Sequence, residues 1–421
     1  MTNLENTTVC VVGLGYIGLP TAAIFASRKV PVVGVDVNRG TVDTINEGRI
    51  HIVEPELDIV VRAAVEQGLL RAQTEPAPAS AFLIAVPTPI RGDSHKPDVS
   101  YVRSAAEAIA PHLRFGSLVI LESTSPVGTT EAVAEWLAEA RPDLTFPQTH
   151  GERSDIRIAY CPERVLPGKV IHELVANDRL IGGLTERCSR KAIELYRIFV
   201  AGECIATNAR TAEMAKLIEN SYRDVNIAFA NELSVICDGL GIDVWELIAL
   251  ANRHPRVNIL QPGPGVGGHC IAVDPWFIVN SSPEDARLIR TARIVNDDKP
   301  KWVLEKIATA VAEHLAAHPG ASAEDVVIAC YGLAFKADID DVRSSPALNI
   351  AESILDQHAG PLLVIEPHLD TLPATLDRAR WTDLETAASE ADIHVLLVDH
   401  SAFRGMTPPH GIRIDTRGVG W

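Results

Sequence analysis

Short apolar runs alternate with segments of helical periodicity along most of the chain. Apolar runs bounded by Gly, Pro or Asp are typical of strands buried within a sheet, and helices between successive strands imply a parallel sheet. The N-terminal half contains the runs TVCVV, PVVGV, AFLIAV, SLVILE and IRIAY, and the C-terminal part contains DVVIACY, PLLVIE and ADIHVLLV. The pattern therefore predicts two α/β sheets.

A single long helical segment separates the two sets of strands. Apolar positions recur at helical spacing from about Asn208 through TAEMAKLIENSYRDVNIAFANELSVICDGLG, and Gly239 and Gly241 end the pattern. We predict an α/β protein in which two Rossmann-like, doubly wound domains, at residues 1–205 and 311–421, are joined by a central long-helix domain at residues 206–310.

The composition is that of a globular protein, with 47% hydrophobic and 22% charged residues among 421. A net charge of −17 without a long Lys/Arg run argues against a nucleic-acid partner. No apolar stretch is long enough to span a membrane and the start lacks a secretory pattern, so we expect no membrane partner and a cytoplasmic location. The seven scattered cysteines form no CxxC pair, so we expect thiols and no metal site.

A GxGxxG motif at Gly13, Gly15 and Gly18 follows the first strand and precedes a helix. In that context the glycines permit a tight turn, a close approach of pyrophosphate to backbone, and close helix–strand packing. Asp36 ends the next strand, where a carboxylate accepts hydrogen bonds from ribose hydroxyls and repels a 2′-phosphate. We predict NAD as the cofactor; the alternative is a structural glycine turn with a solvated Asp36.

Two strand-terminal threonines, Thr88 in AVPTP and Thr124 in ESTSPVGTT, stand where such sheets present groups to the nicotinamide. Each is equally well explained as a turn or capping residue.

The segment QPGPGVGGHC ends in Cys270, after a backbone that can pass close to phosphates. A lone cysteine is more often a small buried hydrophobe than a nucleophile. Lys216, Asn220 and Arg223 lie on one face of the long helix and could hold an oxyanion, although charged helix positions usually form a solvated face. Apolar neighbours favour a helix buried on several sides, which supports the functional interpretation; they are Met214, Leu217, Ile218 and Phe229.

Acidic and basic groups complete the candidate site. Glu163 follows the strand IRIAY and Asp274 lies four residues after Cys270, so either carboxylate could activate water near a thioester or could be paired structurally. Local cations suit a nucleotide diphosphate, and the alternative for them is pairing with Asp340 or Asp341; they are Arg253, His254, Arg256, Lys336 and Arg343.

These motifs together resemble the UDP-glucose/GDP-mannose dehydrogenase family over essentially the whole chain. The carriers are GLGYIGLP, GVDVN, VPTP, ESTSPVG, CPERVLPG, RHPRVNILQPGPGVGGHCIAVDP and GLAFKADIDDVRSSPA. The resemblance implies an N-terminal NAD domain, a central helical domain that forms a homodimer, and a C-terminal domain that grips a UDP-sugar.

The resemblance also implies residue roles. Cys270 would be the nucleophile, Lys216 a proton shuttle that stabilises an oxyanion with Asn220, and Glu163 and Asp274 would assist the water chemistry. The residues around the nucleotide sugar would be Arg164, Val165, Lys216, Asn220, Arg223, His254, Arg256, Gly267 and Lys336. The residues around NAD would be Gly13, Gly15, Tyr16, Ile17, Gly18, Asp36, Thr88, Thr124, Thr130 and Arg343.

The implied activity is oxidation of a sugar's primary alcohol to a carboxylate with two NAD per sugar, through a thiohemiacetal and a thioester on cysteine. Family members acting on UDP-glucose or GDP-mannose usually carry Lys before the Asp of the cysteine loop, whereas Val273 stands here, which resembles the N-acetylhexosamine branch. Overall likeness favours UDP-N-acetyl-D-mannosamine, with UDP-N-acetylglucosamine or another nucleotide sugar as the alternative. The product would enter cell-surface polysaccharides such as enterobacterial common antigen.

Two rival functions remain open. A two-electron NAD dehydrogenase or epimerase would need no thiol. A non-catalytic nucleotide-binding protein would need none of Lys216, Asn220 and Cys270, and their presence argues against it.

Overall fold

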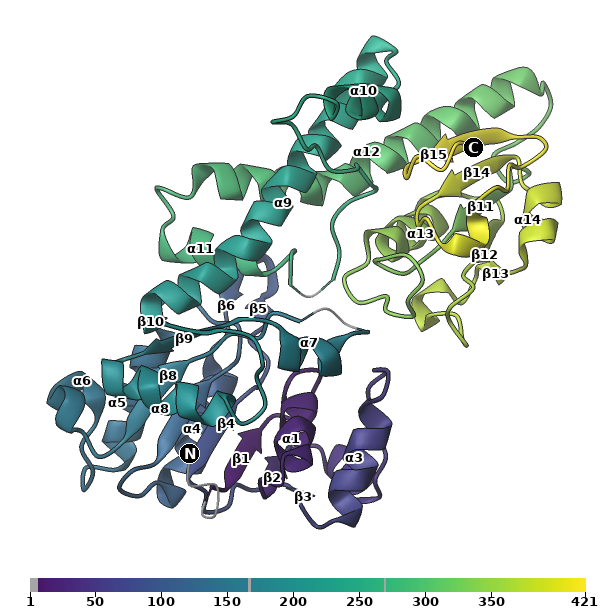
Figure 1. Ribbon diagram of the computed structural model, residues 1–421. Coiled ribbons are helices and arrows are strands. Elements are labelled where there is room, and N and C mark those ends of the chain that lie inside the picture. Colours follow the sequence, from purple (N-terminus) through teal and green to yellow (C-terminus); the bar gives the residue numbers. More distant parts are fainter. Residues whose placement is uncertain (1–6, 166–167, 269) are drawn as a thin grey trace. The chain divides into compact units, whose positions relative to one another are not determined.

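The structure is a computed structural model that describes residues 7–165, 168–268 and 270–421 (Figure 1). It divides into two compact units, of which the first ends at Glu219 and the second spans Asn220–Trp421. Among the described residues, no helix combines the length and the apolar character needed to cross a membrane.

The first unit is built on an eight-stranded sheet, counted over its described residues, with the order β10-β9-β8-β7-β4-β1-β2-β3. The chain adds strands on one side of β1 as far as β3 and then continues with β4 on the other side, so the order reverses between β1 and β4. Ligands of open α/β sheets bind at the carboxyl ends of the strands beside such a reversal. The strands are β1 (Val9–Val12), β2 (Val32–Val35), β3 (Leu70–Gln73), β4 (Ala81–Ile84), β7 (Leu118–Leu121), β8 (Arg157–Tyr160), β9 (Arg179–Gly183) and β10 (Cys204–Asn208).

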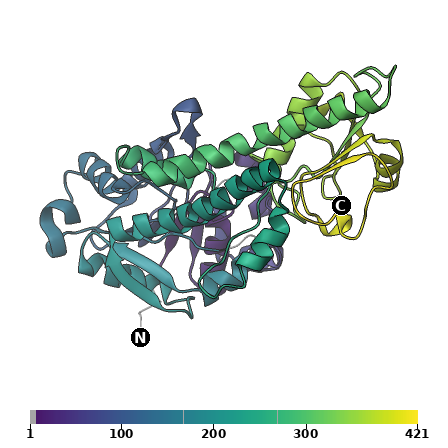
Figure 2. The same ribbon diagram turned by 90° about the horizontal axis from the view of Figure 1, so that it is seen from above.

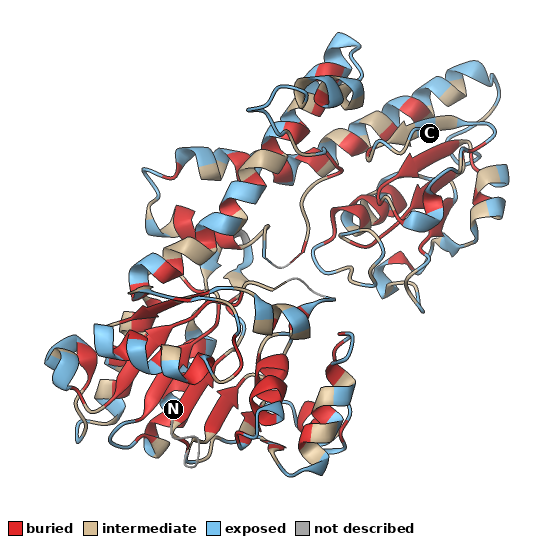
Figure 3. Cartoon of the chain, viewed as in Figure 1, coloured by how far each residue is buried: buried red, intermediate tan, exposed pale blue. Residues whose placement is uncertain are grey.

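Helices cover both faces of this sheet, because the strands β1, β4, β7 and β8 are buried along their length and, apart from Arg157 in β8, apolar (Figure 3). One core joins the sheet to α1, α2, α3, α7 and α8, and another joins its opposite face to α4 and α5. The helices are α1 (Gly18–Ser27), α2 (Arg39–Asn46), α3 (Leu57–Glu66), α4 (Ser100–Ile109), α5 (Thr129–Ala140), α6 (Pro147–His150), α7 (Val170–Ala176) and α8 (Glu186–Tyr196). The predicted doubly wound architecture is confirmed.

One strand pair differs from the predicted parallel arrangement. β8 and β9 run antiparallel, with Ala159 opposite Gly183 and Tyr160 opposite Gly182. Continuing that register past β8 sets Glu163 opposite Arg179, the first residue of β9. A short antiparallel hairpin, β5 (Ile90–Arg91) with β6 (Lys96–Pro97), lies outside the main sheet.

In the second unit, the part of α9 (Ala209–Leu240) from Asn220 onward packs against α12 (Arg287–Ala317) (Figure 2). Polar contacts advance along both helices in the same direction, so the helices run parallel: Asp224 bonds Arg293, Asn231 bonds Asn296, Ser234 bonds Lys299 and Asp238 bonds Lys306. The unit also contains α10 (Val244–Ala251) and α11 (Asp274–Ser281).

The long helix was predicted correctly, and Gly241, at a φ of 68°, follows its last turn. The expectation that α9 is buried on several sides was wrong, because Ile218 and Phe229 are 48% and 52% exposed although Leu217 is buried.

The remainder of the second unit is a parallel sheet, with five strands in its described residues, ordered β13-β12-β11-β14-β15. α12 and α13 contribute to the core on one face and α14 to the core on the other. The elements are β11 (Ile328–Tyr331), α13 (Pro346–Gln357), β12 (Leu362–Ile365), β13 (Arg380–Trp381), α14 (Leu384–Glu390), β14 (Ile393–Leu396) and β15 (Ile412–Asp415). The predicted second Rossmann-like sheet is confirmed.

Candidate active site

The glycine turn between β1 and α1 has the geometry that the motif predicts. Gly13 has a φ of 93° and its amide donates to the Val35 carbonyl at 2.8 Å. A side chain at Gly18 would collide with the Gly13 carbonyl, whereas the space in front of Gly15 is open within 4 Å. The Asp36 carboxylate accepts a hydrogen bond from the Leu14 amide at 3.1 Å. The turn and the acidic residue therefore lie together, and their arrangement fits the ribose and pyrophosphate of a dinucleotide. The two neighbouring residues that the resemblance assigned to NAD follow Gly15: Tyr16 is exposed and Ile17 is half-buried.

The three candidate threonines lie at or beside the carboxyl ends of β4 and β7. The Thr88 hydroxyl donates to the Thr124 carbonyl, so these two loops are held together. Thr130 is fully buried, and both its amide and its hydroxyl donate to the Glu213 carboxylate, which also accepts from the Gly128 amide. Thr130 thus anchors α5 to α9 within this unit.

Glu163 lies in a buried charge cluster that sequence reasoning did not find. Its Oε2 pairs with Arg179 Nη2 at 2.9 Å and its Oε1 accepts from the Arg164 amide at 2.7 Å. Glu122, directly after β7, accepts from the Tyr196 hydroxyl at 2.6 Å. Burial raises the pKa of Glu122 to about 7, against the attraction of Arg179. The run RLIGG could have indicated this cluster, because it predicts an additional strand whose first residue is the cation Arg179.

The cysteine loop of the second unit brings three predicted residues together. Asp274, the first residue of α11, is buried, and its amide donates to the Cys270 carbonyl at 2.9 Å. The Asn220 side-chain amide donates to the Asp274 carboxylate at 2.5 Å. Cys270 is exposed, whereas the six other cysteines are buried. Residue 269 lies outside the described residues. The backbone of Cys270, the Asp274 carboxylate and the Asn220 amide therefore lie together at the start of α11.

The remaining charged candidates lie at or near the surface of their own unit. Lys216 is half-buried and lies one turn before Asn220 on α9, and Arg223 is exposed. The guanidinium of Arg164 pairs with Glu219 at 2.7 Å, and half-buried Val165 follows it.

The glycine-rich loop packs closely on the loop after β11. A side chain at Gly267 would meet Pro346, Ser344 and Phe335 within 2.8 Å, so this glycine is required for the approach. The approached loop carries Lys336 and Arg343, which are exposed. Arg343 pairs with Asp341 at 2.6 Å, as the alternative interpretation allowed. His254 and Arg256 are exposed on the loop after α10.

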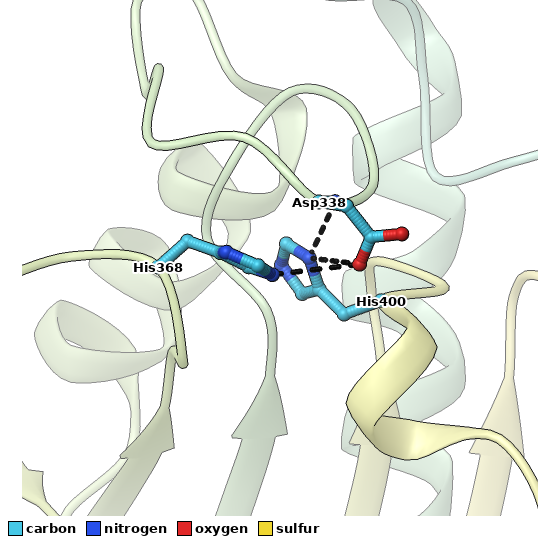
Figure 4. Close-up of side chains that lie close together, drawn as sticks. All are labelled: Asp338, His368 and His400. Atoms are coloured by element: carbon cyan, nitrogen blue, oxygen red, sulfur yellow. Dashed lines mark hydrogen bonds and ion pairs between the residues drawn. The ribbon is translucent and has the colours of Figure 1, made fainter.

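A cluster of Asp338, His368 and His400 has a composition that can bind a metal, with one ligand atom from each residue within 4.8 Å of the others (Figure 4). Hydrogen bonds already engage two of its members: His400 Nδ1 accepts from the Asp338 amide at 2.9 Å, and Asp338 Oδ1 accepts from the Ser401 amide and hydroxyl. His368 Nε2 lies 3.4 Å from Asp338 Oδ1. His400 Nε2 lies 3.2 Å from buried Glu366. The cluster ties together the loops that follow β11, β12 and β14.

Family models match the chain in three consecutive parts. They are the NAD binding domain of the UDP-glucose/GDP-mannose dehydrogenase family at residues 7–200, its central domain at 210–298 and its UDP binding domain at 329–419. The chain belongs to the UDP-glucose/GDP-mannose dehydrogenase family. The predicted cofactor, NAD, and the predicted class of NAD-dependent nucleotide-sugar dehydrogenase are thereby confirmed, and the UDP binding domain supports a UDP-sugar substrate.

Relatives within this dehydrogenase family match over the full length. The UDP-N-acetyl-D-mannosamine dehydrogenase of Escherichia coli (strain K12) is 65% identical over 99% of this chain and 100% of its own. The NDP-N-acetyl-D-galactosaminuronic acid dehydrogenase of Ralstonia nicotianae is 61% identical over 99% of this chain and 97% of its own. Among solved structures, the UDP-D-ManNAc dehydrogenase of Pyrococcus horikoshii has a TM-score of 0.85 at 38% identity and covers 98% of this chain and 96% of its own.

Proposed function

We propose that this enzyme oxidises carbon six of UDP-N-acetyl-D-mannosamine to the uronate with two NAD per sugar. The observation that carries the mechanism is the cluster of Cys270, Asn220 and Asp274 at the start of α11. The substrate rests on the full-length likeness to relatives that are named for it. NAD, held at the glycine turn and Asp36, would supply the hydride acceptor.

The residues of the chain would then act in sequence. Lys216 or a water bonded to it takes the proton of the alcohol. The Cys270 sulfur attacks the resulting aldehyde and forms a thiohemiacetal, whose oxidation gives a thioester. Lys216 and Asn220 donate hydrogen bonds to the oxyanion of each tetrahedral stage. In hydrolysis a water oxygen bonds the carbonyl carbon, the water proton passes to Glu163 or Asp274, and the carbon–sulfur bond breaks to return the Cys270 thiolate.

Counting NADH with the Cys270→Ser variant tests the covalent mechanism. The wild-type enzyme should form two NADH per sugar and release a uronate. Cys270→Ser should bind NAD and the UDP-sugar with unchanged affinity, yet release no uronate. Cys237→Ser, which alters a buried cysteine of α9, is the matched control and should retain full yield. Normal uronate release by Cys270→Ser would remove the thioester from the mechanism, and one NADH per sugar in the wild type would favour a two-electron dehydrogenase.

A panel of nucleotide sugars tests the substrate. UDP-N-acetyl-D-mannosamine should give the highest kcat/KM, above UDP-N-acetylglucosamine, UDP-N-acetylgalactosamine, UDP-glucose and GDP-mannose. The galacto sugar belongs in the panel because one relative is named for the galactosaminuronic product. A preference for any other sugar would contradict the proposed substrate while leaving the oxidation chemistry intact.

We further propose a homodimer formed through α9. Its exposed apolar side chains recur at spacings of four and seven residues and therefore form one stripe: Ile218, Tyr222, Phe229, Ile236 and Leu240. A stripe of this kind on a soluble protein marks an interaction surface, and a second copy presents a matching one. Light scattering should give twice the chain mass for the wild type and a monomer for Tyr222→Asp/Phe229→Asp. Ile59→Asp, at an exposed apolar residue of α3, is the control and should stay dimeric.

A cytoplasmic location and a supply of uronate to cell-surface polysaccharides complete the proposal. Thiols persist in the reducing cytoplasm, which agrees with the six buried cysteines outside the active site.

A further inference from the structure

A buried network connects Glu163 to a second carboxylate, Glu122, at the carboxyl ends of β7 and β8. Glu122 and Glu163 are 2% and 7% exposed, and Arg179 between them is 4% exposed. Tyr196, fully buried on α8, closes the network from the helix side. We call these four residues and Cys161 the Glu122 cluster.

The hydrogen bonds of the two carboxylates are unequal. Both oxygens of Glu163 are engaged, one by Arg179 and the other by the Arg164 amide. Glu122 has one engaged oxygen, Oε1, which accepts from Tyr196. Its Oε2 is buried without a hydrogen-bond partner among the described residues. A buried carboxylate with a bare oxygen is costly when charged, so Glu122 is the member of the pair that holds a proton more readily.

The other titratable groups facing Glu122 do not change this balance. Burial raises the pKa of the Cys161 thiol to about 12, and burial also raises the pKa of Tyr196. Both therefore stay neutral, and Arg179 is the cation that acts on Glu122 and on Glu163 alike. Its guanidinium also lies over the rings of Tyr196 and Phe199, at 5.0 Å and 5.5 Å, so its position is fixed.

We infer that Glu122 is a positioning residue for thioester hydrolysis, because its charge decides how strongly Arg179 holds the carboxylate of Glu163. This inference rests on the proposed function, in which Glu163 receives the proton of the attacking water. When Glu122 is neutral, Arg179 stabilises the negative charge of Glu163 alone. With Glu122 ionised, Arg179 is shared, and Glu163 takes the water proton more readily.

The pH dependence follows from this sharing. Burial raises the pKa of Glu122 to about 7, so its change of charge falls near neutral pH. The rate of hydrolysis should rise as pH increases through about 7, by about threefold for a modest change in the strength of a general base. The first hydride transfer, in which Glu163 takes no part, should not show this rise.

Glu122→Gln tests the inference because a glutamine keeps the acceptor for Tyr196 and stays neutral at every pH. Single-turnover experiments would measure uronate release and NADH formation between pH 6 and 9. We expect Glu122→Gln to match the wild type at pH 6, to hydrolyse about threefold more slowly at pH 8.5, and to form the first NADH at the wild-type rate throughout. Tyr196→Phe removes a bond that favours the charged form, so it should move the rise to higher pH. Glu139→Gln, an exposed residue of α5, is the control and should keep the wild-type profile.

A rate that Glu122→Gln lowers equally at all pH values, or leaves unchanged, would overturn the inference and indicate a structural role for Glu122. A wild type that makes no uronate would instead overturn the proposed function, which the same experiment reports separately. Infrared difference spectra of wild type against Glu122→Gln give a second reading that needs no turnover. They should show a carboxylic-acid band that disappears as pH rises through about 7, and the absence of a titrating band would also overturn the inference.

Discussion

Replacing Asp224 should destabilise the second unit, because it leaves a buried charge without its partner. Asp224 and Arg293 join α9 to α12 and are 0% and 1% exposed, with 2.5 Å between Oδ1 and Nη1. Removing one partner of a buried ion pair typically costs about 3–5 kcal/mol, because the other charge is left uncompensated. Arg293 also contacts Asp297, whose side chain is 47% exposed, and Asn296 keeps a bond to the Asp224 carbonyl. We therefore expect Asp224→Ala to cost about 3 kcal/mol, at the lower end of that range.

Urea unfolding followed by tryptophan fluorescence would measure this change in the free energy of unfolding. A double variant, Asp224→Leu/Arg293→Met, removes both charges and fills a similar volume. We expect it to lie within about 1 kcal/mol of the wild type, because apolar replacement of a buried pair is often neutral. Asp224 Oδ2 and Arg293 Nε have no hydrogen-bond partner among the described residues, so the native pair is not fully compensated. A loss below about 1 kcal/mol in Asp224→Ala, or a double variant as unstable as the single one, would refute this reasoning.

Four further substitutions have defined outcomes. Gly18→Ala should lower the Tm of the enzyme without ligand, because its methyl group would meet the Gly13 carbonyl. Gly15→Ala should leave that Tm unchanged and should weaken NAD binding, measured by calorimetry. Equal effects of the two substitutions would contradict the geometry of the turn. Burial lowers the pKa of Lys299 to about 7, so the folded state binds fewer protons than the unfolded chain between about pH 7 and 10.5 and wild-type stability rises with pH across that window. Lys299→Met should therefore be the more stable protein near pH 6, by up to about 4 kcal/mol in urea unfolding, and should lose this advantage near pH 10. Asp36→Asn should weaken the binding of NAD about tenfold and reduce the ratio of kcat/KM for NAD to that for NADP. An unchanged ratio would show that Asp36 does not contact the ribose.

The elements with the strongest patterns could be predicted from the sequence. The apolar runs that became β1, β4, β7, β8, β11, β12 and β14 are buried along their length, and a continuous apolar run reports that burial directly. The long helix α9 was predicted because a 3.6-residue period is unmistakable over 32 residues. The glycine turn was predicted with its partner Asp36, because the turn leaves no room for a side chain at Gly13 or Gly18.

The charge partners could not be predicted in the same way. Nothing in the local sequence around Glu163 names Arg179 as its partner, because the pairing depends on a strand that runs against its neighbour. Likewise, the exposure of Ile218 and Phe229 depends on how the folded chain packs around α9, and an apolar residue at a helical position has the same appearance in a core and on a surface. Long-range register and partner choice are properties of the folded chain.

The reversed direction of β9 places a limit on insertions within β9 itself. The pairing of Tyr160 with Gly182 fixes the register, so residues added to the connection before Arg179 would leave the arginine opposite Glu163. One residue inserted between Arg179 and Gly182 would instead move the arginine one position along the strand and turn it toward the opposite face of the sheet. Single insertions should therefore be tolerated before Arg179 and not within β9, a contrast that an insertion library would reveal.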